Sequence, residues 1–271
     1  MKLTVFFLTI ALLNTSQSRK AQADEYITIA STTSTQDTGL LGEILPNFTK
    51  STGISVRVIA AGTGQAIKIA ENGDADVLLV HHKESEEAFI AAGFGVKRYD
   101  LMYNDFVVIG PAQDPAKISG LKDVVKAFIK IASSKSIFLS RGDDSGTNKK
   151  ENTIWFAGGI DINKYSGSWY RKTGSGMGAT LNMAATMNGY TIADRGTWLS
   201  FKNKERLEIL VEGDPRLHNS YGVILVNPKR HPHVKADAGR KLINWLISNE
   251  GQNAIKAFKI NGEQLFKSNL E

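Results

Sequence analysis

Short apolar runs alternate with longer amphipathic segments along the chain. The runs at 26–30, 55–60 and 76–80 predict strands. The segments at 38–50 and 64–72 predict helices, and in the first of them apolar side chains recur at helical spacing: Leu40, Leu41, Ile44, Leu45 and Phe48. Pro46 inside this helix predicts a kink or an early stop. Such alternation predicts an α/β fold with mostly parallel sheets.

Two longer apolar runs stand apart, "LMYNDFVVIGP" (101–111) and "YGVILVNP" (221–228), and each ends in proline. Between them a second α/β set is predicted from the segments 121–132, 136–140, 145–157, 175–188, 190–193 and 207–211. Helices near 235–248 and 250–258 follow. We therefore predict two lobes. Lobe I comprises 24–105 and 219–271, lobe II comprises 106–218, and the two long strands cross between them as a hinge.

The N-terminus resembles a secretory signal peptide. Lys2 is followed by the apolar stretch 3–13, and Ala21-Gln22-Ala23 provides a cleavage site. We predict a signal peptide at 1–23 with Asp24 as the new N-terminus. Its removal takes away three basic and no acidic residues, which lowers the net charge from +6 to +3.

The composition also limits the choice of partners. The 271 residues hold no cysteine, so a lipidated cysteine at the signal junction is excluded. No long Lys/Arg run follows the signal peptide, which argues against nucleic acid. We expect a soluble periplasmic protein and a monomer.

Polar, glycine-rich loops follow several predicted strands: "STTSTQDTGLL" (31–41), "AGTGQA" (61–66), "SRGDDSGTNKKE" (140–151), "TGSGMGATL" (173–181) and "ADRGTWL" (193–199). Each leads into a helix, and open α/β sheets bind ligands at the carboxyl ends of strands. Helix starts carry unpaired N–H groups and bind anions. The same residue types are also ordinary helix caps. The five consecutive hydroxyl residues at 31–35 exceed what one cap requires and favour a binding role.

The stretch 140–151 carries the most specific chemistry. Arg141 has a fork of N–H donors that matches two oxygens of an oxyanion. Ser145, Gly146 and Thr147 add hydroxyl and main-chain donors at a helix start. Of Asp143 and Asp144, we predict that one caps the helix and the other holds Arg141 or Lys149. The alternative is an Arg–Asp pair that only braces a turn.

Other motifs are weaker. "HHKE" (81–84) resembles a metal cluster, but neighbouring side chains on a strand point to opposite faces, so no metal site is predicted. "TGSGMG" (173–178) lacks the preceding strand of a dinucleotide site. No nucleophile–His–acid set is visible, so neither a catalytic residue nor a cofactor is predicted.

Four of these stretches together resemble the periplasmic tungstate-binding proteins of bacterial ABC importers: "TTSTQDTGLL", "SRGDDSGTNKKE", "TGSGMGATLNMA" and "YTIADRGTWLS". The resemblance covers nearly all of 24–271. It implies a two-lobed periplasmic-binding fold of type II, a tetrahedral oxyanion in the interlobe cleft, delivery to a membrane permease and no catalysis. It also implies the ligand-binding residues, which are Thr32, Thr33, Ser34, Thr63, Arg141, Ser145, Gly146, Thr147 and Arg195. Asp194 is expected to orient Arg195.

Alternative ligands remain open at this point. The string from Arg141 to Thr147 also resembles the loop of phosphate-binding proteins. Phosphate often keeps a proton and benefits from a carboxylate acceptor, and Asp37, Asp143 and Asp144 all lie near the site in sequence. Molybdate is nearly equal to tungstate in size and charge, so only the resemblance favours tungstate. A secreted hydrolase with Asp143 or Asp144 as general base is the remaining alternative.

Overall fold

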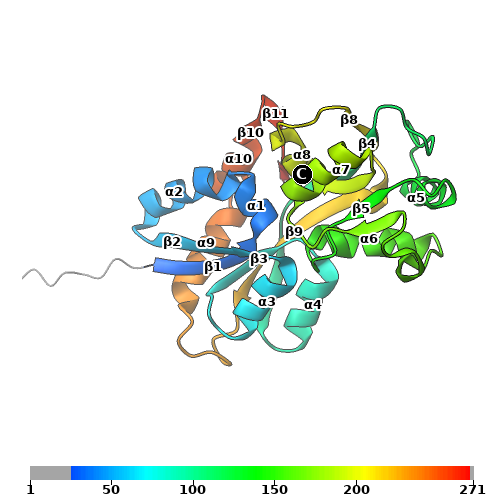
Figure 1. The fold of residues 1–271 in the computed structure, drawn as a ribbon. Coiled ribbons are helices and arrows are strands. Elements are labelled where there is room, and N and C mark those ends of the chain that lie inside the picture. Colours follow the sequence, from blue (N-terminus) through cyan, green and yellow to red (C-terminus); the bar gives the residue numbers. More distant parts are fainter. Residues whose placement is uncertain (1–25, 269–271) are drawn as a thin grey trace, which may run out of the picture.

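The computed structural model describes residues 26–268, so the predicted signal peptide and its cleavage site lie outside the described residues. These residues form two lobes that share one eight-stranded sheet (Figure 1). Its strand order is β12 (Lys267–Ser268), β4 (Gly95–Pro111), β9 (His218–Val226), β3 (Val77–Val80), β1 (Tyr26–Thr32) and β2 (Ser55–Ala61), while β7 (Thr191–Asp194) and β8 (Leu207–Val211) pair with β4. Within 26–268, no helix has both the length and the apolar character needed to cross a membrane.

Lobe I contains both ends of the described chain (Figure 1). Its strands are β1 (Tyr26–Thr32), β2 (Ser55–Ala61), β3 (Val77–Val80), the first part of β4 (Gly95–Pro111), β9 (His218–Val226) and β12 (Lys267–Ser268), with a small hairpin of β10 (Lys259–Ile260) and β11 (Glu263–Gln264). Its helices are α1 (Thr33–Asp37), α2 (Leu40–Thr52), α3 (Thr63–Glu71), α4 (Lys83–Ala91), α9 (Ala236–Ile247) and α10 (Asn249–Ala257).

Strand β3 of lobe I is buried on both faces. In β3, Val77 and Leu79 pack into the core formed with α2, α9 and α10. Leu78 and Val80 face the opposite core, formed with α3 and α4. Helices on both faces explain why this strand is a continuous apolar run without alternation.

Lobe II is built from the middle of the chain. Its elements are α5 (Val124–Ser133), β5 (Phe138–Ser140), α6 (Gly146–Ala157), a 3₁₀ turn η1 (Ile162–Tyr165), β6 (Tyr170–Lys172), α7 (Met177–Met187), β7 (Thr191–Asp194), α8 (Arg195–Ser200), β8 (Leu207–Val211) and a second 3₁₀ turn η2 (Pro215–Leu217). The end of β4 alternates between two cores. Phe106 and Val108 pack on the α5–α6 side, while Val107 and Ile109 pack on the α7–α8 side.

Strands β4 and β9 connect the lobes. The residues of β4 from Gly95 to Asp105 pair with β9, and those from Phe106 to Pro111 pair with β7 and β8. The prediction of mostly parallel sheets is wrong. Among the named strands, β1–β2, β1–β3 and β5–β6 pair in parallel, whereas every pair that involves β4 or β9 is antiparallel. The reason is that β4 and β9 run between the lobes in opposite directions.

Pro46 does not end its helix early, because α2 continues from Leu40 to Thr52. A proline inside a helix removes one backbone hydrogen bond and crowds the preceding turn. The apolar face of α2, from Leu40 to Phe48, is buried in the lobe I core. Burial of that face outweighs the local cost, since tertiary packing supplies most helix stability in proteins.

Candidate functional site

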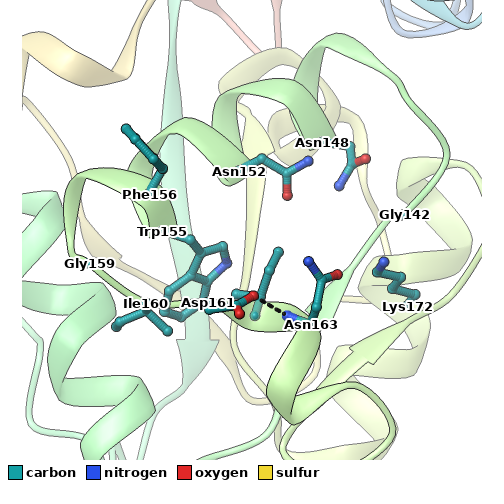
Figure 2. A pocket seen from close by; sticks show the side chains of 11 residues that line it. Gly142, Asn148, Asn152, Trp155, Phe156, Gly159, Ile160, Asp161, Asn163 and Lys172 are labelled. Atoms are coloured by element: carbon teal, nitrogen blue, oxygen red, sulfur yellow. Dashed lines mark hydrogen bonds between the residues drawn. The ribbon is translucent and has the colours of Figure 1, made fainter.

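Two cavities flank the loop between β5 and α6. The larger has a volume of about 670 Å³ and lies on the outer side of α6. Figure 2 shows that Trp155, Phe156 and Ile160 form much of its wall, together with several asparagines and one cation, Lys172. Apolar and amide groups dominate this wall, so it lacks the concentrated donor chemistry that a small anion requires.

The smaller cavity, of about 340 Å³, lies between the lobes. Its lining residues come from the loops predicted to bind a ligand: Thr33, Gly62, Gly64, Gln65, Arg141, Asp143, Asp144, Gly174, Ser175 and Gly176. This cleft is the candidate site.

Several helices begin at the cleft. Helices α1 and α3 begin there from lobe I, and α7 and the loop before α6 approach from lobe II. The caps of α3 and α7 are Gly62 and Gly176, which provide no side-chain bond to the first turn. Unpaired N–H groups and the positive ends of helix dipoles therefore meet in one cavity, an arrangement suited to an anion.

The lobe I wall consists of neutral hydroxyl groups. Thr32 caps α1 by accepting from the backbone N–H of Thr35, and its Oγ1 also lies 3.1 Å from Ser34 Oγ. Ser34 Oγ lies 3.2 Å from Nε2 of the buried His81. Thr33, between them, lines the cavity. The predicted donors Thr32, Thr33 and Ser34 thus lie together at the start of α1.

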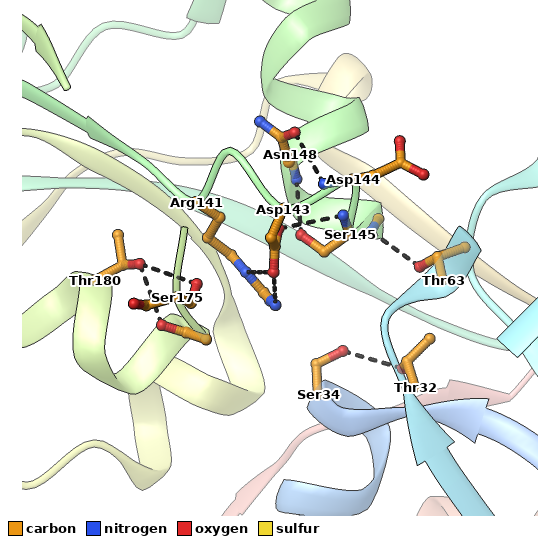
Figure 3. Close-up of polar contacts among 12 residues, drawn as sticks. Thr32, Ser34, Thr63, Arg141, Asp143, Asp144, Ser145, Asn148, Ser175 and Thr180 are labelled. Atoms are coloured by element: carbon orange, nitrogen blue, oxygen red, sulfur yellow. Dashed lines mark hydrogen bonds and ion pairs between the residues drawn. The ribbon is translucent and has the colours of Figure 1, made fainter. Parts of the chain in front are cut away.

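The two walls touch directly. The backbone N–H of Gly146 in lobe II donates to Oγ1 of Thr63 in lobe I at 2.9 Å (Figure 3). A side chain at Gly64 would place its Cβ 2.5 Å from Oδ2 of Asp144. The cleft is therefore closed around a small volume, and a larger residue at position 64 would displace the Asp144 side chain.

Arg141 is the buried cation of the site. It is 5% exposed, and its Nε and Nη2 donate to Oδ2 of Asp143 at 3.1 and 2.6 Å (Figure 3). The other oxygen of Asp143 accepts from the backbone N–H of Ser145 at 3.2 Å. Within 26–268, the third guanidinium nitrogen, Nη1, has no hydrogen-bond partner. Asp143 therefore holds Arg141 in place, while Nη1 of the guanidinium stays available to a ligand.

Neither aspartate caps α6, so that part of the prediction is wrong. Ser145 is the cap, since its Oγ accepts from the backbone N–H of Asn148 at 3.2 Å. Asp144 pairs with Lys149 at 2.5 Å. Asp37 is exposed at the end of α1 and does not line the cavity. The Ser145 hydroxyl caps α6 without adding negative charge. The carboxylates of Asp143 and Asp144 pair instead with Arg141 and Lys149.

Thr147 carries an unsatisfied buried hydroxyl. It is 2% exposed, and its Oγ1 has no partner among the described residues. A buried polar group without a partner costs about 1–3 kcal/mol, so its presence beside Ser145 and Gly146 indicates a donor placed for an absent acceptor. Thr147, like the predicted ligands Thr32, Ser34, Thr63, Ser145 and Gly146, is not among the residues that line the smaller cavity, so its role stays a prediction.

Behind the loop, Glu151 anchors both of its ends. Its carboxylate accepts from Ser140 at 2.7 Å and Tyr170 at 2.8 Å, and from Trp155 and Asn148 on its own helix. Burial raises the pKa of Glu151 to about 7, and the hydrogen bonds oppose this rise. Because Ser140 precedes Arg141 and Asn148 follows Thr147, this buried carboxyl fixes the loop from within lobe II.

Arg195 is paired with two carboxylates, and Asp194 does not orient it as predicted. Arg195 donates twice to Asp105 and once to Glu212, and it does not line the cavity. These carboxylates raise its pKa further. Asp194 instead accepts from the backbone and hydroxyl of Thr197 and caps α8. These ion pairs hold Arg195 between β4, α8 and the residue after β8, outside the cavity lining.

Sequence reasoning missed some residues of the cleft. Ser175 lines the cavity from the "TGSGMG" loop, although no residue of that loop was predicted to bind. His81 does not line the cavity but contacts Ser34 Oγ, and its place directly after β3, at the carboxyl end of a strand, was the available signal. His82 caps α4 instead, so the two neighbouring histidines serve different elements. Among the described residues, no group of three or more His, Cys, Asp or Glu side chains could hold a metal.

Comparison with known proteins agrees with this architecture. The model of the PBP superfamily domain matches residues 16–250. The chain belongs to the PBP superfamily. It is 50% identical to the tungstate-binding protein TupA of Peptoclostridium acidaminophilum over 238 residues, which is 87% of this chain and 82% of the relative.

Two solved structures are similar along most of the chain. The tungstate-binding protein TupA from Desulfovibrio alaskensis G20 is 47% identical, with a TM-score of 0.80 over 91% of this chain and 100% of that chain. The tungstate ABC transporter protein from Geobacter sulfurreducens is 46% identical, with a TM-score of 0.78 over 87% of this chain and 100% of that chain. The predicted two-lobed α/β fold is confirmed.

Proposed function

We propose that this protein captures tungstate in the interlobe cleft and delivers it to the permease of an ABC importer. Relatives that share about half of its residues are named as tungstate-binding proteins. The observation that carries the proposal is the donor set of the cleft. Arg141, buried with a free nitrogen, lines the cleft beside the starts of several helices, and the buried hydroxyl of Thr147, without a partner among the described residues, lies in the first turn of α6.

The proposed ligands come from both lobes. Thr32, Thr33, Ser34 and Thr63 are the donors of lobe I, and Arg141, Ser145, Gly146 and Thr147 are the donors of lobe II. Thr63 and Ser145 each use their oxygen as an acceptor, so their hydroxyl protons are free to donate. The N–H of Gly146 is bound to Thr63 in the structure and would exchange that partner for an oxyanion oxygen. Asp143 and Asp144 support Arg141 and Lys149.

The state of the carboxylates favours an anion without protons. Both oxygens of Asp143 already accept hydrogen bonds, and Asp144 pairs with Lys149. A protonated anion needs a free acceptor, whereas a fully deprotonated tetrahedral dianion needs donors only. Molybdate meets the same requirement. Phosphate is the second candidate, because Asp143 and Asp144 both line the cavity and either would accept a phosphate proton if it released one of its present contacts.

The setting of the protein follows from the same proposal. We propose export by the predicted signal peptide, release into the periplasm as a monomer and docking on a membrane permease. No reaction is proposed, because the cleft binds the oxyanion through donors and leaves it chemically unchanged. A hydrolase would require a free general base, and both aspartates of the cleft are engaged.

Calorimetric titration of the folded protein with tungstate, molybdate, phosphate and sulfate tests the proposal. We expect nanomolar affinity for tungstate, comparable or weaker affinity for molybdate and far weaker affinity for phosphate. Tighter binding of phosphate than of tungstate, or no heat with tungstate, would contradict it. Turnover of a phosphate ester by the same preparation would favour the hydrolase.

A further inference from the structure

His81 is a buried histidine that contacts both lobes. It follows β3, is 6% exposed, and its Nδ1 lies 3.0 Å from Oδ1 of Asn219 on β9. On its other side, Nε2 lies 3.2 Å from Ser34 Oγ at the start of α1. A Cβ at Gly146 would lie 2.6 Å from its Cε1, so the start of α6 packs directly against the ring.

The ring is neutral, because burial lowers the pKa of His81 to about 4 and the charge of Arg141 acts in the same direction. A neutral imidazole has one nitrogen that donates and one that accepts. Oδ1 of Asn219 can only accept, which places the ring proton on Nδ1. Nε2 then accepts the proton of the Ser34 hydroxyl, and that proton is not available to an anion.

The same side chains can be satisfied in the opposite direction. Asn219 now donates through Nδ2 to Oδ1 of Asn104 at 2.6 Å, while Nδ2 of Asn104 is buried without a partner among the described residues. If both amides turn over, Asn104 donates to Asn219, and Asn219 donates to Nδ1 of His81. Nε2 then carries the ring proton and donates to Ser34 Oγ. The hydroxyl proton of Ser34 becomes free to point into the cleft.

The two arrangements make the same number of hydrogen bonds around the ring, since the contact from Asn219 Nδ2 to the Tyr221 hydroxyl at 3.3 Å is replaced by one in the opposite direction. Each leaves one buried amide atom of Asn104 unpaired, and each keeps both ring nitrogens of His81 bonded. A bound oxyanion shifts the balance, because it accepts from Ser34 in only one of them. The ring stays neutral throughout. Nδ1 releases a proton and Nε2 takes one up by exchange with water while the cleft is open.

We propose that His81 is a positioning residue whose tautomer follows the occupancy of the anion site, with the ring proton on Nδ1 when the site is empty and on Nε2 when it is filled. This inference rests on the proposed function, since it requires an oxyanion that accepts from Ser34. In this proposal the Ser34 hydroxyl donates to Nε2 of His81 when the site is empty and to an oxygen of the ligand when it is filled.

The test is nitrogen-15 NMR of protein labelled in its five histidines and titrated with sodium tungstate. Ring-nitrogen shifts distinguish protonated from unprotonated nitrogens, and His81→Gln, which keeps a donor and an acceptor, identifies the His81 signals. We expect protonated Nδ1 in the free protein and protonated Nε2 at saturation. The signals of His231 and His233, which bond backbone carbonyls elsewhere in lobe I, should stay unchanged.

Ser34→Ala provides the matched variant. It removes the hydroxyl that links the ring to the anion, so it should bind tungstate about 10- to 100-fold more weakly, and His81 should keep one tautomer at saturation. The same tautomer in both states of the wild type, or a change that persists in Ser34→Ala, would overturn the proposal. Calorimetry on the same samples separates the two proposals. Binding with an unchanged tautomer overturns the role of His81 alone, whereas no binding overturns both.

Discussion

The two walls of the cleft present donors by different means. The lobe I wall is uncharged, and its threonine and serine hydroxyls are ordered by one another and by the neutral His81. The lobe II wall contains Arg141 and Lys149, each paired with an aspartate, and Glu151 lies behind it. Only lobe II therefore contributes charged side chains to the site.

This division has a physical consequence. A buried dianion needs at least one strong cationic partner, but each extra buried charge carries a desolvation cost. Lobe II supplies that partner on a rigid loop fixed by Asp143 and Glu151. Lobe I completes the ligand shell with neutral groups, which cost less to bury when the cleft is empty. We expect the lobes to differ in how strongly their residues affect affinity.

The largest effect is expected for Arg141→Ala. Loss of a charged, desolvated partner costs about 2–5 kcal/mol, or roughly 30- to 4,000-fold in tungstate affinity. Arg141→Lys keeps the charge but loses the fork, so it should recover only part of this loss. Calorimetry of the folded variants measures both effects. Arg195→Ala is the comparison variant and should bind nearly as well as the wild type, because Arg195 is held by Asp105 and Glu212.

Wild-type affinity in folded Arg141→Ala would show that the arginine only braces its turn. A large loss in Arg195→Ala would show that its ion pairs open in the complex and that the charge of lobe II is shared between two arginines.

The walls should also respond to pH with opposite signs. The pKa of His81 is about 4 in the folded state against 6.5, so folding loses stability as pH falls from 6.5 towards 4. The pKa of Glu151 is about 7 against 4.5, so its contribution is lost as pH rises from 4.5 to 7. Glu86, also near 7, acts like Glu151. Between pH 4.5 and 6.5 each group changes the free energy of unfolding by about 3 kcal/mol.

Urea denaturation across this pH range measures the difference. His81→Gln should make stability fall more steeply with rising pH than in the wild type, and Glu151→Gln should flatten the fall. Glu87→Gln, at an exposed position on α4, is the control and should leave the slope unchanged. Parallel pH profiles for all three variants would show that neither buried group titrates as described.

Thr147→Val tests the unsatisfied hydroxyl of lobe II. Valine keeps the shape and removes the donor, so tungstate affinity should fall about 10- to 150-fold, as expected for a hydrogen bond to a charged group. The ligand-free protein should be as stable as the wild type or slightly more stable, since a buried unpaired group is removed. Thr153→Val, at an exposed position on the same helix, should change neither property. Unchanged affinity in Thr147→Val would remove this residue from the ligand shell.

A smaller effect is expected on the lobe I side. Thr63→Val removes one neutral hydroxyl donor to the anion, which is worth about 0.5–1.5 kcal/mol, or roughly 2- to 12-fold in affinity. Stopped-flow measurement of tungstate release should show faster dissociation. A loss as large as that of Arg141→Ala would contradict the division of roles between the walls.

The sequence predicted the parts of this molecule that rest on local patterns. The amphipathic stretch of α2 and the apolar run of β3 have strong periodicity or composition, and both elements were located. Helix α4 was missed because Glu86 and Phe89 are its only buried residues, which leaves little periodic signal. The antiparallel direction of β4 and β9 depends on how the chain passes between lobes, and no local pattern encodes it.

The candidate site also has parts that local sequence predicts and parts that it does not predict. The loop from Ser140 to Glu151 could be identified because an arginine beside hydroxyls and glycines at a helix start is typical of anion binding. The partner of each charged side chain could not be predicted. Arg195 binds Asp105, which is 90 positions away, and the distance between them depends on the pairing of β4 with β7. His81 was hidden for the same reason, since its contacts to Ser34 and Asn219 are all long-range.

A crystal structure of the tungstate complex, with tungsten located by its anomalous scattering, would show directly where the anion binds. We expect one tungsten site between the starts of α1 and α3 and the loop before α6. Its oxygens should accept from the Arg141 guanidinium and from Thr147 Oγ1. Tungsten in the cavity beside Trp155 and Phe156, or an occupied cleft in which Thr147 Oγ1 stays unpaired and Arg141 binds only Asp143, would contradict it.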